Sequence, residues 1–445
     1  MPHRRRRVSK RATVVGAGFA GVEAAAQLSR AGIAVDLYEM KPVRYSPAHK
    51  SPDFAELICS NSFKAKRVGS AAGLMKEEMS QFHSLCVSCA QETAVPAGGS
   101  LSVDRAAFSR MVTEAIEGDP NITVHREEVT KIPDEGDAVI IAAGPLASDA
   151  LAADIEQLCG DSLHFFDAVA PIVSGDSVDM SRAFCQSRYD RGGDDDYINC
   201  PMNKEEYERF YDALIHAESA ELHDFDKKHG VYEGCMPIEV MASRGPDTMR
   251  FGPLKPVGLR DPHTGHRPWA ALQLRKETRE GSMYNLVGFQ TNLKWGEQKR
   301  VFSMIPGLEH AEFLRYGVMH RNTFLNSPQL LDADFHFRER PGLYFAGQIT
   351  GVEGYMESAM SGILAGLNAA RYINGEEPLI LPRFTMMGAL SSYISDKMIE
   401  NFQPMGANFG VIPPLPERIR DKKQRYEALA QRSLDWFHEN LGGAL

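Results

Sequence analysis

The chain has 445 residues, of which 43% are hydrophobic and 24% charged, and its formal net charge at pH 7 is −10. A chain of this length is longer than one hydrophobic core ordinarily supports, so two or three domains are expected. No apolar run is long enough to span a membrane and no signal-peptide core follows the N-terminus, so we expect a cytoplasmic protein. The negative charge argues against nonspecific coating of nucleic acid, although a local basic face can still steer an RNA.

The cysteines and the first eleven residues also bear on the redox environment of the protein and on its binding to RNA. Seven cysteines, an odd number, argue against a disulfide framework and for thiols that are buried or reactive. Residues 1–11, MPHRRRRVSKR, hold the densest cationic cluster. We interpret them as a disordered leader, with an RNA-binding arm as the alternative.

The stretch from Ala12 to Glu39 has the pattern of a βαβ unit that binds a dinucleotide. Its glycines have G-x-G-x-x-G spacing: Gly16 permits a tight turn, Gly18 lets the backbone approach a pyrophosphate, and Gly21 lets the helix lie close to the strand. An acid at the end of the second strand accepts a bond from an adenosine ribose and repels a 2′-phosphate. The pattern predicts FAD or NAD rather than NADP, held by Gly16, Ala17, Gly18, Phe19, Ala20, Gly21 and Glu39.

Three cysteines follow this unit. Helical character is expected from Ala55 to Ser62, around Cys59, and an amphipathic helix from Gly73 to Ser84. Cys59 has polar and cationic neighbours that favour a reactive thiolate, but most free cysteines are packing residues, and the sequence leaves both readings open. We interpret Cys86 and Cys89 as packing, since the pair does not follow the βαβ unit at a redox position and no second pair suggests zinc.

The next segment completes the first part of the FAD-binding domain, residues 12–145. Asp104 is expected to cap a helix, and strands are expected at 122–125 and 138–142. Residues 146–337 form a different, inserted unit of mixed α and β structure. It contains a helix from Lys204 that Asn203 caps, and strand-like runs broken by glycine and proline, whose loops are expected to face the cofactor.

The chain then returns to the first domain in residues 338–375. A short strand from Leu343 to Ala346 runs into a glycine-rich turn and a helix of small residues, which is similar to a second FAD signature. Two such signatures favour FAD over NAD, with candidate glycines Gly347, Gly351 and Gly354. Residues 376–445 are a C-terminal appendage. The predicted fold is α/β: a Rossmann-type FAD-binding domain with an inserted mixed α/β domain.

Eight motifs occur in order between about Ala12 and Arg371: GAGFAGVEAA, ELICSNS, GLMKEEM, VPAGGSLSVDR, EGCMPIEVMASRG, GFQTNLKWGEQKRVF, GVMHRNTFLNSP and FAGQITGVEGYMESAMSGILAGLNAAR. Together they resemble the TrmFO family, the bacterial folate- and FAD-dependent tRNA (uracil-5-)-methyltransferases. The resemblance implies that 5,10-methylenetetrahydrofolate donates one carbon to C5 of uridine 54 in the tRNA T-loop. It also implies that reduced FAD supplies the electrons and that NAD(P)H re-reduces the flavin.

The resemblance assigns catalytic roles to Cys59 in ELICSNS and Cys235 in EGCMPIEVM. Uracil C5 is a poor nucleophile until a thiolate adds at C6, so a reactive cysteine is chemically expected. The family is thought to use a second cysteine beside the isoalloxazine. We assign Cys59 to the flavin and Cys235 to the uracil.

Bases of an RNA loop stack on aromatic and planar cationic side chains. Candidates for such a face, with a solvated surface as the alternative, are Arg244, Arg250, Lys294, Lys299, Arg300 and Arg321, with Trp295 and Tyr316 nearby. Three other functions stay open: the same methylation of a ribosomal uridine, a non-enzymatic RNA-binding flavoprotein and, less favoured, a flavin disulfide reductase.

Overall fold

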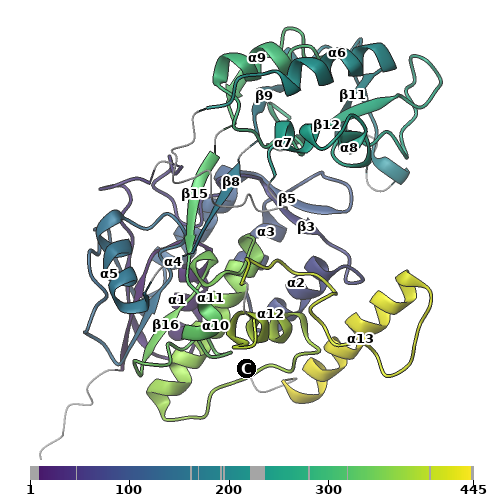
Figure 1. The fold of residues 1–445 in the computed structure, drawn as a ribbon. Coiled ribbons are helices and arrows are strands. Elements are labelled where there is room, and N and C mark those ends of the chain that lie inside the picture. The colour runs from purple at the N-terminus through teal and green to yellow at the C-terminus, as the bar shows by residue number, and fades with distance from the viewer. Residues whose placement is uncertain are drawn as a thin grey trace, which may run out of the picture.

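The computed structural model describes residues 10–441, except 47, 161–162, 169, 191–192, 194–195, 221–235, 279–280, 318 and 400–401. Cys235 and nearly all of the basic leader therefore lie outside the described residues. Figure 1 shows two bodies, one above the other. An antiparallel ribbon of β8 (Leu163–Ala168) and β15 (Met319–Phe324) runs between them.

A parallel five-stranded sheet forms the centre of the lower body, with strand order β16-β7-β1-β2-β6. Each strand is short and mostly apolar, as expected for a parallel sheet that helices cover on both faces. The last strand in sequence, β16, forms one edge of the sheet beside β7, and the first strand, β1, lies at its centre, so segments far apart in the chain build one layer. The strands are β1 (Arg11–Val15), β2 (Ala34–Tyr38), β6 (Ile122–His125), β7 (Ala138–Ile141) and β16 (Leu343–Phe345).

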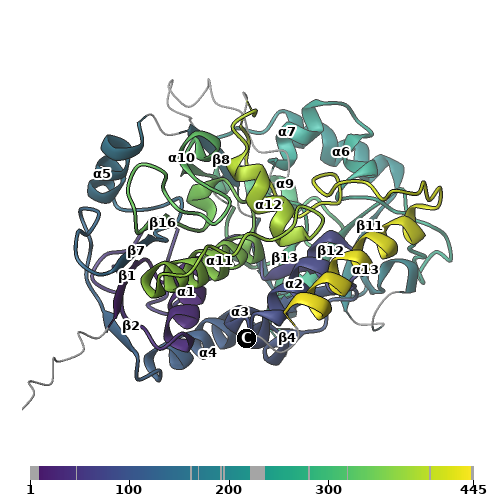
Figure 2. The same ribbon diagram turned by 90° about the horizontal axis from the view of Figure 1, so that it is seen from below.

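Helices α1 (Phe19–Arg30) and α11 (Tyr355–Asn374) pack against each other almost backbone to backbone (Figure 2). A Cβ atom placed on Gly362 would lie 2.1 Å from the carbonyl oxygen of Ala20, and one on Gly366 would lie 2.7 Å from the Cα atom of Ala24. Small residues on both helices therefore permit the contact. Because each helix follows a glycine-rich turn, this packing brings the two turns to the same edge of the sheet.

Several predicted elements are confirmed. Helix α4 (Arg105–Glu117) begins after Asp104, whose carboxylate accepts a hydrogen bond from the Ala107 N–H at 3.0 Å. Helix α6 (Lys204–Ile215) begins after Asn203, which forms a complete capping box with Glu206. Such caps satisfy backbone donors that have no partner inside the helix.

The expected helix around Cys59 is wrong. Residues 55–61 form an irregular loop, and strand β3 (Ser62–Ala65) follows it. The guanidinium of Arg105 donates to the carbonyl oxygens of Leu57 at 2.7 Å and Ile58 at 3.2 Å. Those carbonyls would have bonded along the chain in a helix, so a distant side chain replaces the helical bonds.

A small antiparallel sheet and the C-terminal helices complete the lower body. Buried Glu78 on α2 accepts hydrogen bonds from the Met386 and Met387 N–H groups at 2.7 and 2.8 Å and from the Ser433 hydroxyl at 2.5 Å. The C-terminal segment therefore shares the core of the FAD-type unit. These elements are β4 (Ala94–Val95), β5 (Ser100–Val103), α2 (Ala71–Gln81), α3 (Leu85–Glu92), α12 (Met386–Ser395) and α13 (Lys422–Asn440).

The upper body has its own hydrophobic core under a six-stranded antiparallel sheet of order β10-β11-β12-β13-β9-β14. Its strands are β9 (Ile172–Ser174), β10 (Phe184–Cys185), β11 (Tyr197–Met202), β12 (Ala270–Lys276), β13 (Met283–Leu286) and β14 (Phe313–Arg315). Its remaining α-helices are α7 (Ile238–Ser243), α8 (Thr248–Phe251) and α9 (Trp295–Phe302). Helices α5 (Asp149–Cys159) and α10 (Ser327–Leu330) belong to the lower body.

The predicted fold class, a Rossmann-type domain with an inserted α/β unit, is confirmed by this architecture. Of the helices in the described ranges, none has both the length and the apolar character that crossing a bilayer requires.

Candidate cofactor and catalytic site

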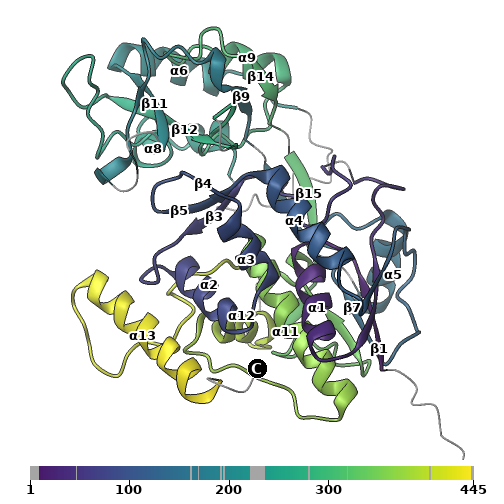
Figure 3. The same ribbon diagram turned by 180° about the vertical axis from the view of Figure 1, so that it is seen from behind.

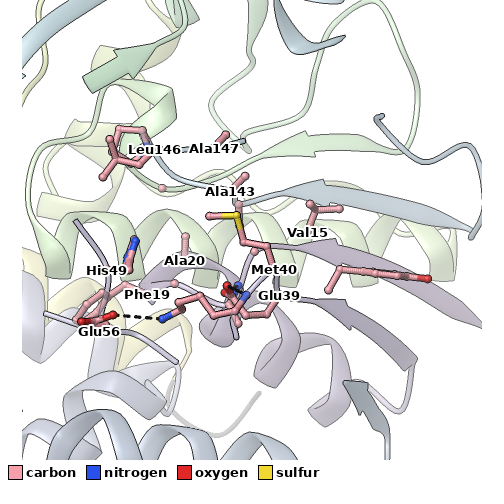
Figure 4. Close-up of a pocket in the computed structure, with 18 of the residues that line it drawn as sticks. Val15, Phe19, Ala20, Glu39, Met40, His49, Glu56, Ala143, Leu146 and Ala147 are labelled. Atoms are coloured by element: carbon pink, nitrogen blue, oxygen red, sulfur yellow. Dashed lines mark hydrogen bonds and ion pairs between the residues drawn. The ribbon is translucent and has the colours of Figure 1, made fainter. Parts of the chain in front are cut away.

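A pocket opens at the carboxyl ends of the parallel strands, beside the N-termini of α1 and α11. Its space amounts to about 1060 Å³, including the part open to solvent. Figure 4 shows Glu39 and Glu56 on one side and Ala143, Leu146 and Ala147 on the other. Of the predicted cofactor residues, those in the lining are Gly16, Ala17, Gly18, Phe19, Ala20, Glu39 and Gly347.

The three glycines of the first turn differ in what surrounds them. Gly16 has a φ of +100°, and a Cβ there would lie 2.5 Å from the Ala142 carbonyl oxygen. A Cβ on Gly21 would lie 1.7 Å from the Gly16 carbonyl oxygen, whereas a Cβ on Gly18 would meet nothing within 4 Å. Gly16 and Gly21 are therefore needed for packing of the turn, and Gly18 leaves space open in front of the α1 N-terminus. We call this turn, from Gly16 to Gly21, the glycine cradle; the space in front of it fits the diphosphate of a dinucleotide.

Glu39 stands at the end of β2 with its carboxylate buried against the same turn. It accepts a hydrogen bond from the Ala17 N–H at 3.0 Å and another from the Lys41 N–H at 3.0 Å. A carboxylate has lone pairs beyond these two bonds, so it can also accept a ribose hydroxyl. The nearby ammonium of Lys41 is bonded to the Asp53 carbonyl at 2.6 Å and lies 3.5 Å from Glu56. This acidic corner disfavours a 2′-phosphate.

The second glycine turn directs α11 toward the pocket. Gly347, Gly351 and Gly354 all have φ between +81° and +127°, the left-handed region that favours glycine. A Cβ on Gly351 would lie 2.4 Å from the Phe402 ring, and one on Gly354 would lie 2.1 Å from the Glu357 carboxylate. Gly351, Gly354 and Gly21 are outside the pocket lining, so they act on the shape of the backbone.

Cys59 is not itself in the pocket lining, but its neighbour Ile58 and its hydrogen-bond partner Tyr355 both are. The Tyr355 hydroxyl accepts a hydrogen bond from the Cys59 N–H at 2.8 Å and donates to its Sγ atom at 3.3 Å. The Tyr355 ring stacks on Phe19 with centroids 4.8 Å apart, and both side chains line the pocket. Burial raises the pKa of Tyr355 well above its usual value, and the neighbouring Cys59 raises it further. The hydroxyl therefore stays protonated and available to a thiolate.

Side chains from both bodies form hydrogen bonds to the loop that carries Cys59. Arg105 on α4 donates to the Cys59 carbonyl at 3.3 Å and pairs with Glu277 of the inserted unit at 3.1 Å. Burial by itself would lower the pKa of Arg105, but Glu277 raises it above its ordinary value. Arg275 on β12 donates to the Ser60 hydroxyl at 2.7 Å and to Asn61 Oδ1 at 3.0 Å. The inserted unit thus fixes the loop that carries the candidate cysteine.

Reasoning from the sequence missed Tyr355, Arg105, Arg275 and Glu277. Tyr355 and Arg105 lie inside motifs that the resemblance singled out, GVEGYMES and VPAGGSLSVDR, but no periodicity or spacing marks them as partners of Cys59. Cys235 lies outside the described residues. Its role and that of Cys59 stay predictions.

Replacement of Tyr355 by phenylalanine tests the contact with the thiol. The ring and its stacking on Phe19 remain, but the donor to Sγ is lost. A hydrogen bond to a charged group contributes about 1.5 kcal/mol or more, so alkylation of Cys59 by iodoacetamide at pH 7 is expected to slow about tenfold. Peptide mass spectrometry measures the rate, with exposed Cys185 as internal reference. An unchanged ratio of the two rates would show that the hydroxyl does not support the thiolate.

Comparison with known proteins agrees with this geometry. Residues 11–377 match the family model described as glucose inhibited division protein A. The methylenetetrahydrofolate–tRNA-(uracil-5-)-methyltransferase TrmFO of Pelotomaculum thermopropionicum is 57% identical over 433 residues, which cover 96% of this chain and 98% of the relative. The TrmFO of Enterococcus faecalis is 55% identical over 429 residues, or 96% and 98% of the two chains.

The chain belongs to the TrmFO family. A solved structure of GidA from Aquifex aeolicus has a TM-score of 0.70 to it, covering 98% of this chain and 74% of that one at 17% sequence identity. That likeness shows that the TrmFO-family chain shares the GidA fold.

The candidate RNA face of this TrmFO-family chain carries many cations that already have acidic or aromatic neighbours. Lys294 lies 2.7 Å from Glu218, and Arg300 lies 2.6 Å from Glu297. Trp295 is 63% exposed and stacks on Tyr316 with centroids 5.8 Å apart. Arg250 lies over Trp269, and the side chain of Arg321 is outside the described part of the structure. An RNA role for this face stays a prediction.

Two further cysteines of the TrmFO-family chain lie in the core. Cys86 and Cys89 on α3 are buried and unbridged. Burial raises the pKa of both thiols, that of Cys89 to about 11. Within the described ranges, no group of histidine, cysteine and acidic side chains is arranged to hold a metal ion.

Proposed function

We propose that this protein transfers the one-carbon unit of 5,10-methylenetetrahydrofolate to C5 of a uridine in the T-loop of tRNA, with FAD as its bound redox cofactor. The observation that carries the proposal is Cys59, which Tyr355 holds beside a glycine cradle for a dinucleotide. Sequence similarity also supports the proposal, because the chain is 57% identical over nearly its whole length to an enzyme named for this reaction.

The residues of the pocket have distinct roles in binding. Gly16, Gly18 and Gly21 admit the diphosphate to the α1 N-terminus, and Glu39 accepts the adenosine ribose hydroxyl. The turn of Gly347, Gly351 and Gly354, together with neighbouring residues of the first turn, Ala17, Phe19 and Ala20, shapes the remaining wall. When bound and reduced, FAD supplies the electron pair that converts a methylene unit to a methyl group.

The two cysteines divide the chemistry. Cys59 acts at the flavin side, because its loop borders the pocket through Ile58 and its sulfur faces Tyr355. Cys235 adds to uracil C6, which raises the electron density at C5 so that this carbon can attack the one-carbon unit. Departure of the C5 proton and of the thiolate then restores the pyrimidine ring. Each cysteine is thus occupied at one reaction centre.

We also propose NAD(P)H as the reductant and the cytoplasm as the location. Each methyl group formed consumes two electrons beyond those in the methylene carrier, so oxidised flavin must be reduced again from outside the folate. Among readily available hydride donors a nicotinamide fits this need. Cytoplasmic location is supported by the odd number of cysteines, none of them bridged in the described residues, and by the RNA substrate.

The test is incubation of the purified protein with methylenetetrahydrofolate, NADPH and an unmodified tRNA transcript, followed by nucleoside analysis. We expect 5-methyluridine at one position, no product when the T-loop uridine is replaced by cytidine, and none with S-adenosylmethionine as sole donor. Parallel reactions contain NADH or a ribosomal RNA fragment. Product on the ribosomal fragment alone would move the substrate to ribosomal RNA. Product with S-adenosylmethionine alone would overturn the proposed chemistry.

A further inference from the structure

A second, wider cleft lies on the side of the molecule where α13 faces the inserted unit across β3 and β5 (Figures 1 and 3). It amounts to about 2350 Å³, including the part open to solvent. Its walls come from residues 64–67, 69 and 99–100, from residues 188–189, 197 and 273 of the inserted unit, and from residues 421–423 and 426–427 at the start of α13. We call this cleft the basic groove.

The charge of the basic groove is opposite to that of the protein as a whole. Six cationic side chains line it, against only two acidic ones, in a chain whose net charge is −10. Both acids have local partners: Asp421 caps α13 by accepting from the Gln424 N–H at 2.8 Å, and Glu427 lies 3.8 Å from Lys423. The cations are Lys64, Lys66, Arg67, Arg188, Lys422 and Lys423. Such local excess of positive charge attracts polyanions.

Two of these cations stand where they weaken their own helix. Lys422 and Lys423 are the first two residues of α13, and both are exposed. The N-terminus of a helix carries a partial positive charge, so lysines there are unfavourable. Neither side chain is buried in the core: Lys422 lies over the Tyr426 ring and Lys423 lies 3.8 Å from Glu427 on the same helix, so both ammonium groups stay accessible to a ligand in the groove. On the facing wall, Arg188 has a buried Nε atom without a hydrogen-bond partner.

Aromatic side chains accompany the cations. Tyr189 is 49% exposed and has a φ of +63°, a backbone conformation that non-glycine residues rarely adopt. Tyr197 and Tyr426 line the same groove. Of these three rings, Tyr189 is the exposed one, and an exposed ring beside cations can stack on an unstacked base next to a phosphate backbone.

The groove is continuous with the Cys59 loop through shared elements. Lys64 on β3 lies in the groove and pairs with Glu357 at 2.7 Å, two residues beyond Tyr355 on α11. Gln273 on β12 lines the groove, and Arg275 on the same strand binds Ser60. A polyanion in the groove would therefore be positioned with respect to the candidate thiol.

We propose that the basic groove binds the phosphate backbone of the tRNA substrate outside the loop that is methylated. This inference rests on the proposed function and adds where the RNA lies. Binding along Lys66, Arg67, Lys422 and Lys423 places the RNA between the two bodies, so that its loop uridine can reach the Cys59 end of the cofactor pocket.

The test compares tRNA affinity of the whole protein at several KCl concentrations. Lys422→Gln/Lys423→Gln removes two exposed groove charges and keeps good helix formers. Each lost phosphate contact lowers the slope of log affinity against log salt by about 0.7 to 0.9, so we expect a decrease of about 1.5 and roughly tenfold weaker binding near 150 mM KCl. The KM for tRNA rises, while kcat at saturating tRNA and the bound FAD stay unchanged.

The matched control is Lys204→Gln/Arg209→Gln, which removes two exposed charges from α6 on the inserted unit. This control should show the same slope of log affinity against log salt, and the same KM for tRNA, as the wild-type protein. An unaltered slope in the groove variant, with methylation of tRNA intact, would overturn the groove assignment alone. Failure of the unchanged protein to bind and methylate tRNA would overturn the proposed function and this inference with it. A groove variant that lost affinity only for polyglutamate would assign the groove to an acidic protein instead.

Discussion

Gly18→Val is expected to produce a protein that folds but is purified without its yellow flavin. A Cβ on Gly18 meets no atom within 4 Å, and the extended backbone there, with φ of −75°, suits any residue, so the protein is expected to fold. The added side chain instead occupies the space in front of the α1 N-terminus, where a diphosphate would lie. Steric conflict of ~3 kcal/mol weakens FAD binding about a hundredfold. Absorbance near 450 nm and flavin released on denaturation measure the loss.

Gly296→Val is the matched control. Gly296 is exposed on α9, and a Cβ there also meets nothing within 4 Å, but it is outside the cofactor pocket. This variant should retain its FAD. Equal flavin content in the two variants would remove Gly18 from the cofactor site, and an unchanged protein that is colourless and takes up no added FAD would refute the cofactor itself.

Cys59→Ala is expected to lower methyl transfer at least about a thousandfold, the scale of removing a nucleophile from a catalytic site. Only the sulfur is lost, because the Cys59 N–H bond to Tyr355 and the Arg105 bond to the carbonyl involve the backbone. The FAD spectrum should therefore stay nearly unchanged. Cys185→Ala, at an exposed cysteine of the inserted unit, is the control and should keep full activity.

A tRNA that contains 5-fluorouridine separates the two cysteines. A thiolate that adds to C6 of this base stays bonded, because the fluorine at C5 cannot leave as a proton does. If Cys235 attacks the uracil, the covalent protein–RNA adduct should form in Cys59→Ala and be absent in Cys235→Ala. The opposite pattern would exchange the two roles, and full activity of either variant would exclude that cysteine from the mechanism.

The sequence by itself determined the elements whose signals are local. The G-x-G-x-x-G spacing predicts the turn before α1, because the need for glycine at these positions comes from the turn and from the start of the helix that follows it. Asp104 and Asn203 predict helix starts that the structure confirms, since a capping side chain bonds to backbone only three residues away. The eight motifs, read in order, identified the family, and through it the two candidate cysteines. All of these signals can be recognised without knowing which distant residues pack against them.

Only the tertiary structure decided what surrounds Cys59. Local pattern predicted a helix there, but Arg105 takes up the loop carbonyls, and it lies some 46 residues away in sequence. The hydroxyl partner of the sulfur is 296 residues away, and the clamp from β12 comes from another unit. The basic groove likewise joins three segments whose charges are scattered along the chain. Contacts between distant residues depend on how helices and sheets pack, and α1 meets α11 only because glycines on one helix admit alanines of the other.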